Sequence, residues 1–386
     1  MNEGLPLRSG PLDGIGVVEL VGIGPAPLAC SYLEELGATV VRIERSTSHT
    51  GLPDGLAGVG RRPRASLALN LKDPEDAAVA VDVMRGADVV IEGFRPGVTE
   101  RLGIGPTEMI DKNPSLVYLR MTGWGQEGPM AMMAGHDINY IGLNGVLASI
   151  GTTDHPVPPL NLVGDYGGGT MFAVSGILAA LVERATTGRG QVIDAAMIDG
   201  SATLLGPTRD LVNAGLWSEH RASNLLDGGA PFYRTYRTSD DEFMAVGALE
   251  PMFYSAMVHG LGLSEDDLED RLDPANWKRL GEVFAGIFAE RTRAHWTDMF
   301  DGTDGCVTPV LRMAEVADHP HNLARGALTD GPDGPAPSSA PRFSERYVHQ
   351  DTDGNGRELL ETSLGMFGIS AEAIADLNER GVASWS

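Results

Sequence analysis

A histidine within a mostly polar run, Gly135-His-Asp-Ile-Asn-Tyr140, is the first residue that could do chemistry. Histidine titrates near neutral pH, so His136 is a candidate general acid or base. A single histidine is also often structural, and this motif alone leaves both interpretations open. Met130, Met132 and Met133 precede the run. Clustered methionines either fill a core or form a soft apolar surface that accepts varied acyl chains.

An aspartate followed by three glycines, Gly164-Asp-Tyr-Gly-Gly-Gly169, stands directly before an apolar helical pattern. Free N–H groups at a helix N-terminus stabilise negative charge, so this segment is a candidate site for an anionic group. The alternative is that Asp165 only caps the helix. Three glycines are poor helix formers, however, and close approach by a ligand would explain them.

Residues 42–101 hold nine basic and nine acidic side chains, whereas the rest of the chain holds 20 basic against 44 acidic. A neutral, arginine-rich segment in an acidic chain suits an anionic ligand such as a phosphorylated cofactor. Ordinary surface arginine is the alternative for each single member. The basic residues are Arg42, Arg45, Arg61, Arg62, Arg64, Lys72, Arg85, Arg95 and Arg101.

Two further motifs resemble known binding loops but lack a required residue. Gly22-Ile-Gly-Pro25 follows a strand pattern, yet Pro27 takes the place of the third glycine of a dinucleotide fingerprint. That favours a plain strand-to-helix turn. Asp351-Thr-Asp-Gly-Asn-Gly356 resembles an EF-hand loop, but Thr362 stands where the bidentate glutamate belongs, which favours a polar turn.

The elements that must position these residues change in kind along the chain. Short apolar strands alternate with helical patterns in the first half, which is typical of an α/β layer with a largely parallel sheet. After about Leu211 a hairpin and several helices predict a smaller α+β domain. Strands are expected at 14–20, 39–43, 66–71, 89–94 and 116–121, with an apolar run at 192–198 leading into a helix. Helices are expected at 28–36, 73–85, 167–184, 251–259, 277–289, 295–300, 357–364 and 371–380, and a hairpin at 232–249.

The composition excludes several classes of protein. The formal net charge is −24 over 386 residues, from 53 acidic and 29 basic side chains. Such a surface repels nucleic-acid phosphates and acidic membranes, so we expect neither as a partner. Cys30 and Cys306 are too few for a disulfide framework, and no histidine cluster has metal-ligand spacing. We expect a cytoplasmic protein.

Strings of residues in order along nearly the whole chain resemble one protein family. They include Pro11-Leu-Asp-Gly-Ile-Gly-Val-Val-Glu19, Leu36-Gly-Ala-Thr-Val-Val-Arg42, Leu69-Asn-Leu-Lys72, Arg95-Pro-Gly-Val98, Arg101-Leu-Gly103 and Arg120-Met-Thr-Gly-Trp-Gly-Gln126. The more specific ones are Ala134-Gly-His-Asp-Ile-Asn-Tyr140, Asn161-Leu-Val-Gly-Asp-Tyr-Gly-Gly-Gly169 and Gly247-Ala-Leu-Glu-Pro251. Together they resemble the family III CoA-transferase superfamily, and within it the branch that racemises α-methylacyl-CoA thioesters.

The resemblance implies a Rossmann-like large domain, a smaller α+β domain and an interlocked homodimer. The domains would be residues 1–205 (large) and 226–335 (small), with a linker at 206–225 and a C-terminal segment, 336–386, returning to the large domain. It implies catalysis by His136, Asp165 and Glu250, with Glu250 serving the partner's His136. It implies CoA contacts from Arg42, Lys72, Arg95, Arg101, Gly135 and Tyr140. Residues 46–60 match no family pattern and are expected to form a loop over the CoA site.

The implied reaction inverts the carbon beside a thioester through an enolate. It needs two acid/base groups on opposite faces of that carbon, which His136, supported by Glu250, and Asp165 would supply. Backbone N–H groups near Asp165 and Gly167–Gly169 are candidates to stabilise the enolate oxygen. A helix N-terminus lowers the pKa of Asp165 and desolvation raises it, and the sequence leaves open which wins. No metal or redox cofactor is required, since CoA is part of the substrate.

Two alternatives remain. In a CoA-transferase of the same fold, Asp165 would be a nucleophile that forms a mixed anhydride with the acyl group and then a thioester with CoA. That route needs no general-base histidine, so His136 together with Glu250 favours the racemase. A non-catalytic CoA-binding protein would keep the basic residues and lack the acid/base set. The sequence does not predict which acyl chain the substrate carries.

Overall fold

The computed structural model describes residues 10–20, 22–45, 63–331, 334–344 and 356–385. Contacts divide the chain into a large unit (1–146, 159–206 and 343–386) and a small unit (147–158 and 207–342), each described by itself below. The predicted linker 206–225 begins with helix α9 (Gly206–Asn213) and falls almost wholly in the small unit. The loop expected at 46–60, and most of the EF-hand-like motif, lie outside the described residues.

A seven-stranded sheet forms the centre of the large unit, in the order β12-β3-β2-β1-β4-β5-β6. Neighbouring strands are parallel except for β12, which pairs antiparallel with β3. The order 3-2-1-4-5-6 is that of a doubly wound sheet, so the predicted α/β layer with a largely parallel sheet is confirmed. The strands are β1 (Gly16–Leu20), β2 (Thr39–Glu44), β3 (Ala65–Ala68), β4 (Val89–Glu92), β5 (Val117–Thr122), β6 (Val192–Ala196) and β12 (Ala383–Trp385).

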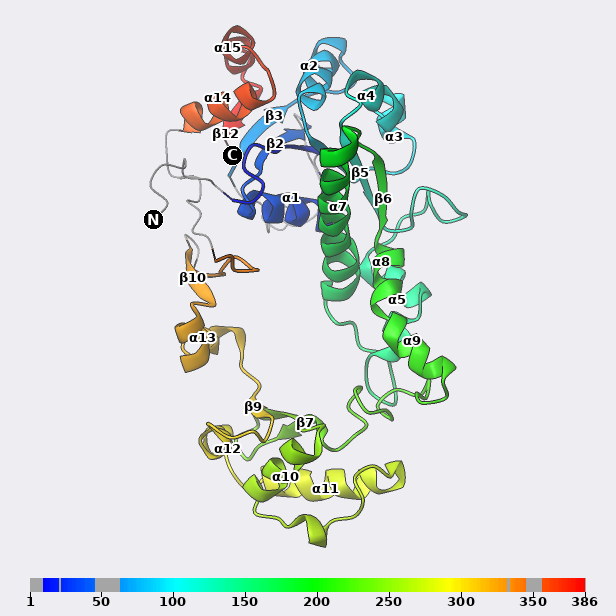
Figure 1. Cartoon of the computed structure of the whole chain (residues 1–386), viewed down its shortest axis with the longest axis vertical. Coiled ribbons are helices and arrows are strands. Elements are labelled where there is room, and N and C mark those ends of the chain that lie inside the picture. The colour runs from blue at the N-terminus through cyan, green and yellow to red at the C-terminus, as the bar shows by residue number, and fades with distance from the viewer. Residues whose placement is uncertain (1–9, 21, 46–62, 332–333, 345–355, 386) are drawn as a thin grey trace. The chain divides into compact units, whose positions relative to one another are not determined.

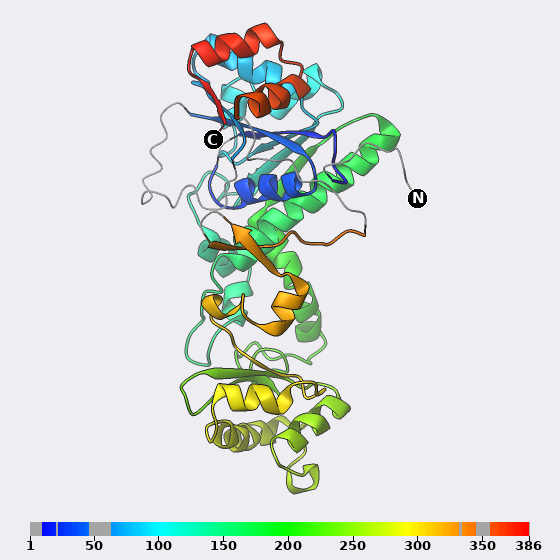
Figure 2. The ribbon, with the colours of Figure 1, turned by 90° about the vertical axis from the view of Figure 1, so that its left-hand side faces the viewer.

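Helices cover both faces of this sheet (Figures 1 and 2). On one face lie α1 (Pro25–Glu35) and α7 (Phe172–Thr187). The other face carries α2 (Pro74–Arg85), α4 (Pro106–Lys112), α14 (Gly356–Met366) and α15 (Ala371–Glu379). Val17 packs into the first core and its neighbour Val18 into the second. A strand buried on both faces is apolar throughout, which is why these strands are continuous runs in the sequence.

The helix predicted from Gly167 begins earlier than expected. The π-helix η2 (Leu162–Met171) runs directly into α7, so Asp165 lies inside a helical turn, and its interpretation as a helix cap is wrong. The glycines let η2 lie against α8 (Met197–Leu204). A Cβ on Gly168 would lie 2.5 Å from the Ser201 nitrogen, and one on Gly200 would lie 2.0 Å from the Gly168 oxygen. Close approach of a helix, and not of a ligand, therefore explains Gly168.

Residues 162–187 form the one helical stretch in the described part of the chain whose length and composition would also fit a membrane span. Core helices of globular proteins meet the same criterion. In the large unit, Ala173, Val174, Ile177 and Ala180 of α7 are buried in the core that covers one face of the sheet. One face of α7 is thus buried within the fold, while Phe172 and Val182 of the same helix are exposed.

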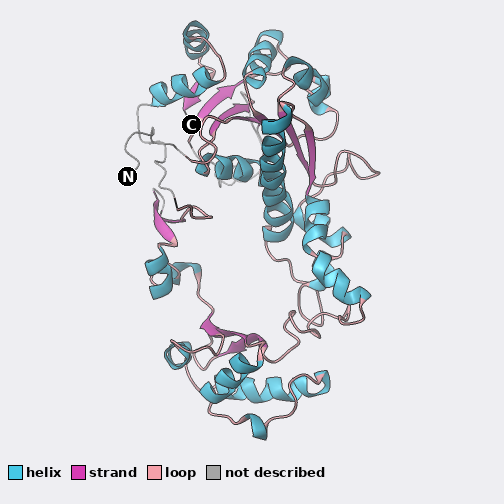
Figure 3. Ribbon diagram, in the orientation of Figure 1, coloured by secondary structure: helices cyan, strands magenta, loops and turns pink. Residues whose placement is uncertain are grey.

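The small unit is a three-stranded antiparallel sheet with helices packed on one face (Figure 3). The predicted hairpin is present as β7 (Tyr233–Arg237) and β8 (Phe243–Gly247), with Asp241 at φ 61° in its turn. A third strand, β9 (Val307–Pro309), was not predicted. The predicted helices are present as α10 (Pro251–Gly260), α11 (Trp277–Phe288) and α12 (Arg293–Phe300). A separate short antiparallel pair, β10 (Leu328–Gly331) with β11 (Gly334–Pro337), lies where the predicted small domain, 226–335, ends.

Candidate active site

A cavity of about 460 Å³ lies at the carboxyl edge of the large sheet, where β1 and β4 are neighbours. In doubly wound sheets the connections from these two strands run to opposite faces, which leaves a crevice where ligands bind. The segments that follow β1, β4, β5 and β6 all contribute to the lining. Its residues include Ile23, Gly24, Pro25, Phe94, Arg95, Trp124, Met133, Gly135, His136, Tyr140, Asp165 and Met197.

The cavity brings together five residues that the sequence singled out, namely Arg95, Gly135, His136, Tyr140 and Asp165. A second cavity of about 360 Å³ at the same edge is lined by residues that follow β2 and β3, among them Arg45 and Lys72. Phe94 lines both cavities. The two cavities are therefore neighbours along the edge of the sheet.

His136 is held in place by its own backbone. It is an extended residue directly before helix α5 (Asp137–Leu143), and its N–H donates to the Asn139 Oδ1 atom at 3.0 Å. Its side chain is exposed, so the imidazole is accessible to a ligand in the cavity. An accessible imidazole on a fixed backbone can act as a general acid or base.

Asp165 is half-buried on η2, and the Asn161 Nδ2 atom donates to its Oδ2 atom at 3.2 Å. Burial raises the pKa of Asp165, and the charge of Asp137 raises it further, whereas the Asn161 hydrogen bond and the charge of His136 lower it. The effect of desolvation on the pKa of Asp165 therefore outweighs the effects that lower it, a question that the sequence left open. Asp165 is thus a stronger base than an exposed aspartate. The sequence assigned Asn161 no role, because the helix was expected to start after it.

Tyr140 fixes the segment that carries His136. Its hydroxyl donates to the Gly135 carbonyl, and its ring packs edge-on against Trp124, with 4.8 Å between the ring centres. A Cβ on Gly123 would lie 2.0 Å from the Tyr140 ring, so glycine is required there. Burial, followed by the charges of Asp165 and Asp137, raises the pKa of Tyr140 to about 12, so its hydroxyl stays protonated at neutral pH.

The glycines after Asp165 do not line the cavity. Gly168 and Gly169 are buried, and a Cβ on Gly169 would lie 3.0 Å from Met197 and 3.3 Å from Pro25. The N–H groups near Gly167–Gly169 were candidates to stabilise the enolate oxygen, and none of these three glycines is among the residues that line the cavity.

The predicted CoA-binding arginines differ in their surroundings. Arg42 is 3% exposed, and its Nε atom donates to the Glu19 Oε2 atom at 3.2 Å. Arg64, also buried, donates to the same oxygen at 2.9 Å and to Ser31. Both therefore belong to a buried ionic network. Arg95 and Arg101 are exposed, the latter at the end of α3 (Val98–Arg101).

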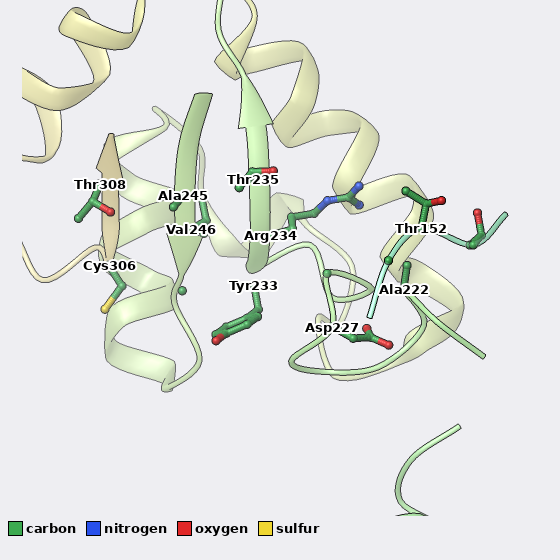
Figure 4. A pocket seen from close by; sticks show the side chains of 14 residues that line it. Thr152, Ala222, Asp227, Tyr233, Arg234, Thr235, Ala245, Val246, Cys306 and Thr308 are labelled. Atoms are coloured by element: carbon green, nitrogen blue, oxygen red, sulfur yellow. The ribbon is translucent and has the colours of Figure 1, made fainter. Parts of the chain in front are cut away.

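Glu250 lies in the small unit, at the residue before α10, and its exposed side chain makes no capping hydrogen bond. The preceding carbonyl, of Leu249, accepts from Arg271 at 2.8 Å. A cavity of about 910 Å³ lies on the sheet of the same unit and includes Gly247 and Cys306. Figure 4 shows Ala245, Cys306 and Thr308 to one side of Tyr233 and Arg234, and Asp227 and Thr152 to the other. Burial, then the charge of Glu250, raises the pKa of Cys306.

Comparison with known proteins gives consistent matches over most of the chain. The sequence pattern of CoA-transferase family III matches residues 12–353. The chain is 46% identical over 372 residues to the α-methylacyl-CoA racemase of Mus musculus, covering 95% of this chain and 96% of the relative. It is 44% identical to the α-methylacyl-CoA racemase of Homo sapiens, with the same coverage. The crystal structure of a CAIB/BAIF family protein from Brucella suis superposes with a TM-score of 0.70 at 25% identity, covering 88% of this chain and 94% of that one.

Proposed function

The chain belongs to CoA-transferase family III, and on that premise we propose that it is an isomerase that inverts the C2 centre of 2-methyl-branched acyl-CoA thioesters. The observation that carries this proposal is that His136 and Asp165 line one cavity at the carboxyl edge of the sheet. The two racemases that are 46% and 44% identical over nearly the whole chain support it.

The two side chains supply the proton transfers that the reaction needs. One of them removes the C2 proton beside the thioester carbonyl, and the electron pair moves onto the carbonyl oxygen as an enolate. The other gives a proton to the opposite face of C2, which inverts its configuration. The raised pKa of Asp165 suits both of its roles, since it makes the carboxylate a better base and keeps the acid populated at higher pH.

The exposed basic residues at this edge suit the CoA part of the substrate. We assign the CoA phosphates to Lys72, Arg95 and Arg101. Arg42 is left out of this set because it is buried beside Glu19. Met133, which lines the cavity, and Met132 are both more than half exposed, so they offer an adaptable apolar surface for the acyl chain.

Glu250 completes the proposed acid/base set from a second subunit. We propose a homodimer in which Glu250 orients or charges the partner's His136. The support is that Glu250 is an exposed carboxylate at a fixed turn, without a capping role for its own helix. A site shared between subunits would make the dimer the active form.

Hydrogen–deuterium exchange at C2 tests this function. In heavy water, the wild-type protein should exchange the C2 proton of a 2-methylacyl-CoA, followed by NMR. His136→Ala and Asp165→Asn should each slow inversion at C2 by about 100-fold or more in both directions, because inversion needs an acid/base group on each face. His321→Ala, which changes an exposed histidine of α13 (Pro320–Arg325), is the matched control and should leave the rate unchanged. Transfer of CoA to a free carboxylic acid, with no exchange, would instead support the transferase.

A further inference from the structure

The first helical turn that carries Asp165 has a hydrogen-bond acceptor from a different element. The first N–H groups of a helix have no partner within the helix. The Asp165 N–H donates to the Oδ2 atom of Asp137 at 2.8 Å. Asp137 is the first residue of α5, immediately after His136, and is 7% exposed. Asp137, which is next to the candidate base His136, thus holds the backbone of the other candidate base, Asp165.

The sequence around this contact is adapted to it. A Cβ on Gly164 would lie 2.4 Å from the Asp137 Oδ2 atom and 2.8 Å from its Cγ atom. A side chain at position 164 would therefore push the Asp137 carboxylate away from the Asp165 N–H. Asn161 holds the Asp165 carboxylate itself at 3.2 Å. Backbone and side chain of Asp165 are thus fixed by two separate groups.

From this geometry we propose that Asp137 is a positioning residue, whose carboxylate sets the place of Asp165 relative to His136 across the reacting carbon. The inference rests on the proposed racemase function. Proton transfer needs donor and acceptor within hydrogen-bond reach, so a displacement of about 1 Å is enough to slow catalysis strongly.

The charge of Asp137 adds an effect that a purely structural role would not have. Burial is the main cause of the raised pKa of Asp165, and the negative charge of Asp137 contributes in the same direction. His136 acts in the opposite direction, and Tyr140 and Arg95 are the other titratable groups that line the cavity with Asp165. Removing the Asp137 charge should therefore lower the pKa of Asp165.

Two variants of Asp137 separate the effect of its hydrogen bond on the position of Asp165 from the effect of its negative charge. Asp137→Asn keeps an oxygen that can accept from the Asp165 N–H but loses the charge, whereas Asp137→Ala loses both. We expect Asp137→Ala to lower kcat by about 10- to 100-fold with KM nearly unchanged. Asp137→Asn should keep kcat within a few-fold of wild type. Asp111→Asn, which removes an exposed charge from α4, is the control for net charge.

The pH dependence of kcat/KM distinguishes the two roles, because a purely structural role of Asp137 would leave it unchanged. When Asp165 acts as the base, activity is lost as the pH falls through its pKa. In Asp137→Asn this acid limb of kcat/KM should move to lower pH, in the one direction of racemisation where Asp165 takes the proton. The inference would be overturned if the acid limb of kcat/KM in Asp137→Asn stayed at its wild-type pH in both directions of racemisation. A folded Asp137→Ala protein with wild-type kcat would also overturn it.

Hydrogen exchange of the backbone gives a measure independent of turnover. Peptides covering residues 162–171 should gain a rapidly exchanging amide in Asp137→Ala and not in Asp137→Asn, by mass spectrometry. Equal protection in both variants would contradict the hydrogen bond. If the wild-type protein shows no exchange at C2 of any 2-methylacyl-CoA, the proposed function fails, while the peptide result still reports on the contact.

Discussion

The Nε atom of Arg120 donates to the Oε1 atom of Glu92 at 2.8 Å, although Glu92 is fully buried. The other Glu92 oxygen accepts from the Phe94 N–H at 2.6 Å. Burial raises the pKa of Glu92, and these hydrogen bonds lower it. Arg120 also bonds Glu100 of α3 at 2.8 Å. One guanidinium therefore ties β4, β5 and α3 together around the loop that carries Arg95.

Removing this guanidinium should destabilise the large unit. Arg120→Ala would leave the buried Glu92 carboxylate without its cation, which costs about 3 kcal/mol. Urea unfolding measures the loss. Arg85→Ala is the matched control, because its ion pair with Asp82 lies on the surface, and such pairs contribute at most about 1 kcal/mol. Equal losses in the two variants would show that Glu92 does not depend on Arg120.

A glycine contact between helices should control both stability and the position of Asp165. A Cβ on Gly200 would lie 2.0 Å from the Gly168 oxygen, so Gly200→Ala forces α8 away from η2. Overpacking of this kind costs about 1–3 kcal/mol, and because η2 carries Asp165 we expect kcat to fall as well. Thermal unfolding and the C2 exchange rate measure the two effects.

Gly286 provides the control for that substitution. It lies inside α11, and a Cβ there would meet no described atom within 4 Å. Gly286→Ala should raise stability by about 0.4–1 kcal/mol, because alanine has less freedom to lose on folding. A Gly200→Ala protein that is as stable and active as Gly286→Ala would refute the close packing of η2 on α8.

The sequence predicted the strands of the large sheet because their residues are buried on both faces, as Val17 and Val18 show. Helix α2 was also predictable from the sequence, because Asp73 and Pro74 are typical of a helix start. In the structure Asp73 accepts from the N–H groups of Glu75 and Asp76. Strand β12 was not, because Ala383–Trp385 pairs with Ala65–Leu67, far away in the chain, and three residues carry little local signal.

The candidate site was predicted in part. His136 and Asp165 were expected to work together, and both line one cavity. The roles of Asn161 and Asp137 were not foreseen, because both depend on η2 starting at Leu162, and a π-helix through three glycines has no sequence pattern of its own. Arg42 was expected to contact CoA because the family resemblance implies it, and the structure places its side chain in a buried ion pair with Glu19.

Lys72 should contribute to binding of CoA and not to the chemical step. Lys72→Ala should raise KM for the acyl-CoA about tenfold, which corresponds to the loss of one charge-assisted hydrogen bond, and leave kcat within about twofold. Lys278→Ala, an exposed residue of α11, is the control. A change in kcat without a change in KM would place Lys72 outside the proposed phosphate site.

Glu250 should matter for turnover and not for stability, since its side chain is exposed and caps nothing. We expect Glu250→Gln to lower kcat by about 100-fold with an unchanged Tm. Glu290→Gln removes an exposed carboxylate elsewhere in the small unit and should change neither quantity.

Mixed dimers test whether Glu250 acts on the partner subunit. In a heterodimer of His136→Ala with Glu250→Gln subunits, a shared site leaves one site of two intact, so co-expression should return about a quarter of the wild-type activity. If Glu250 acts within its own chain, both sites are defective and the mixture stays as inactive as the two parents.

The fate of the C2 centre of a single epimer tests the central claim most directly. Incubation of one epimer of a 2-methylacyl-CoA with the protein in heavy water should give about equal amounts of both epimers, and each inverted molecule should carry one deuterium at C2. Retention of configuration and of the C2 proton, while CoA passes to an added carboxylic acid, would contradict the account.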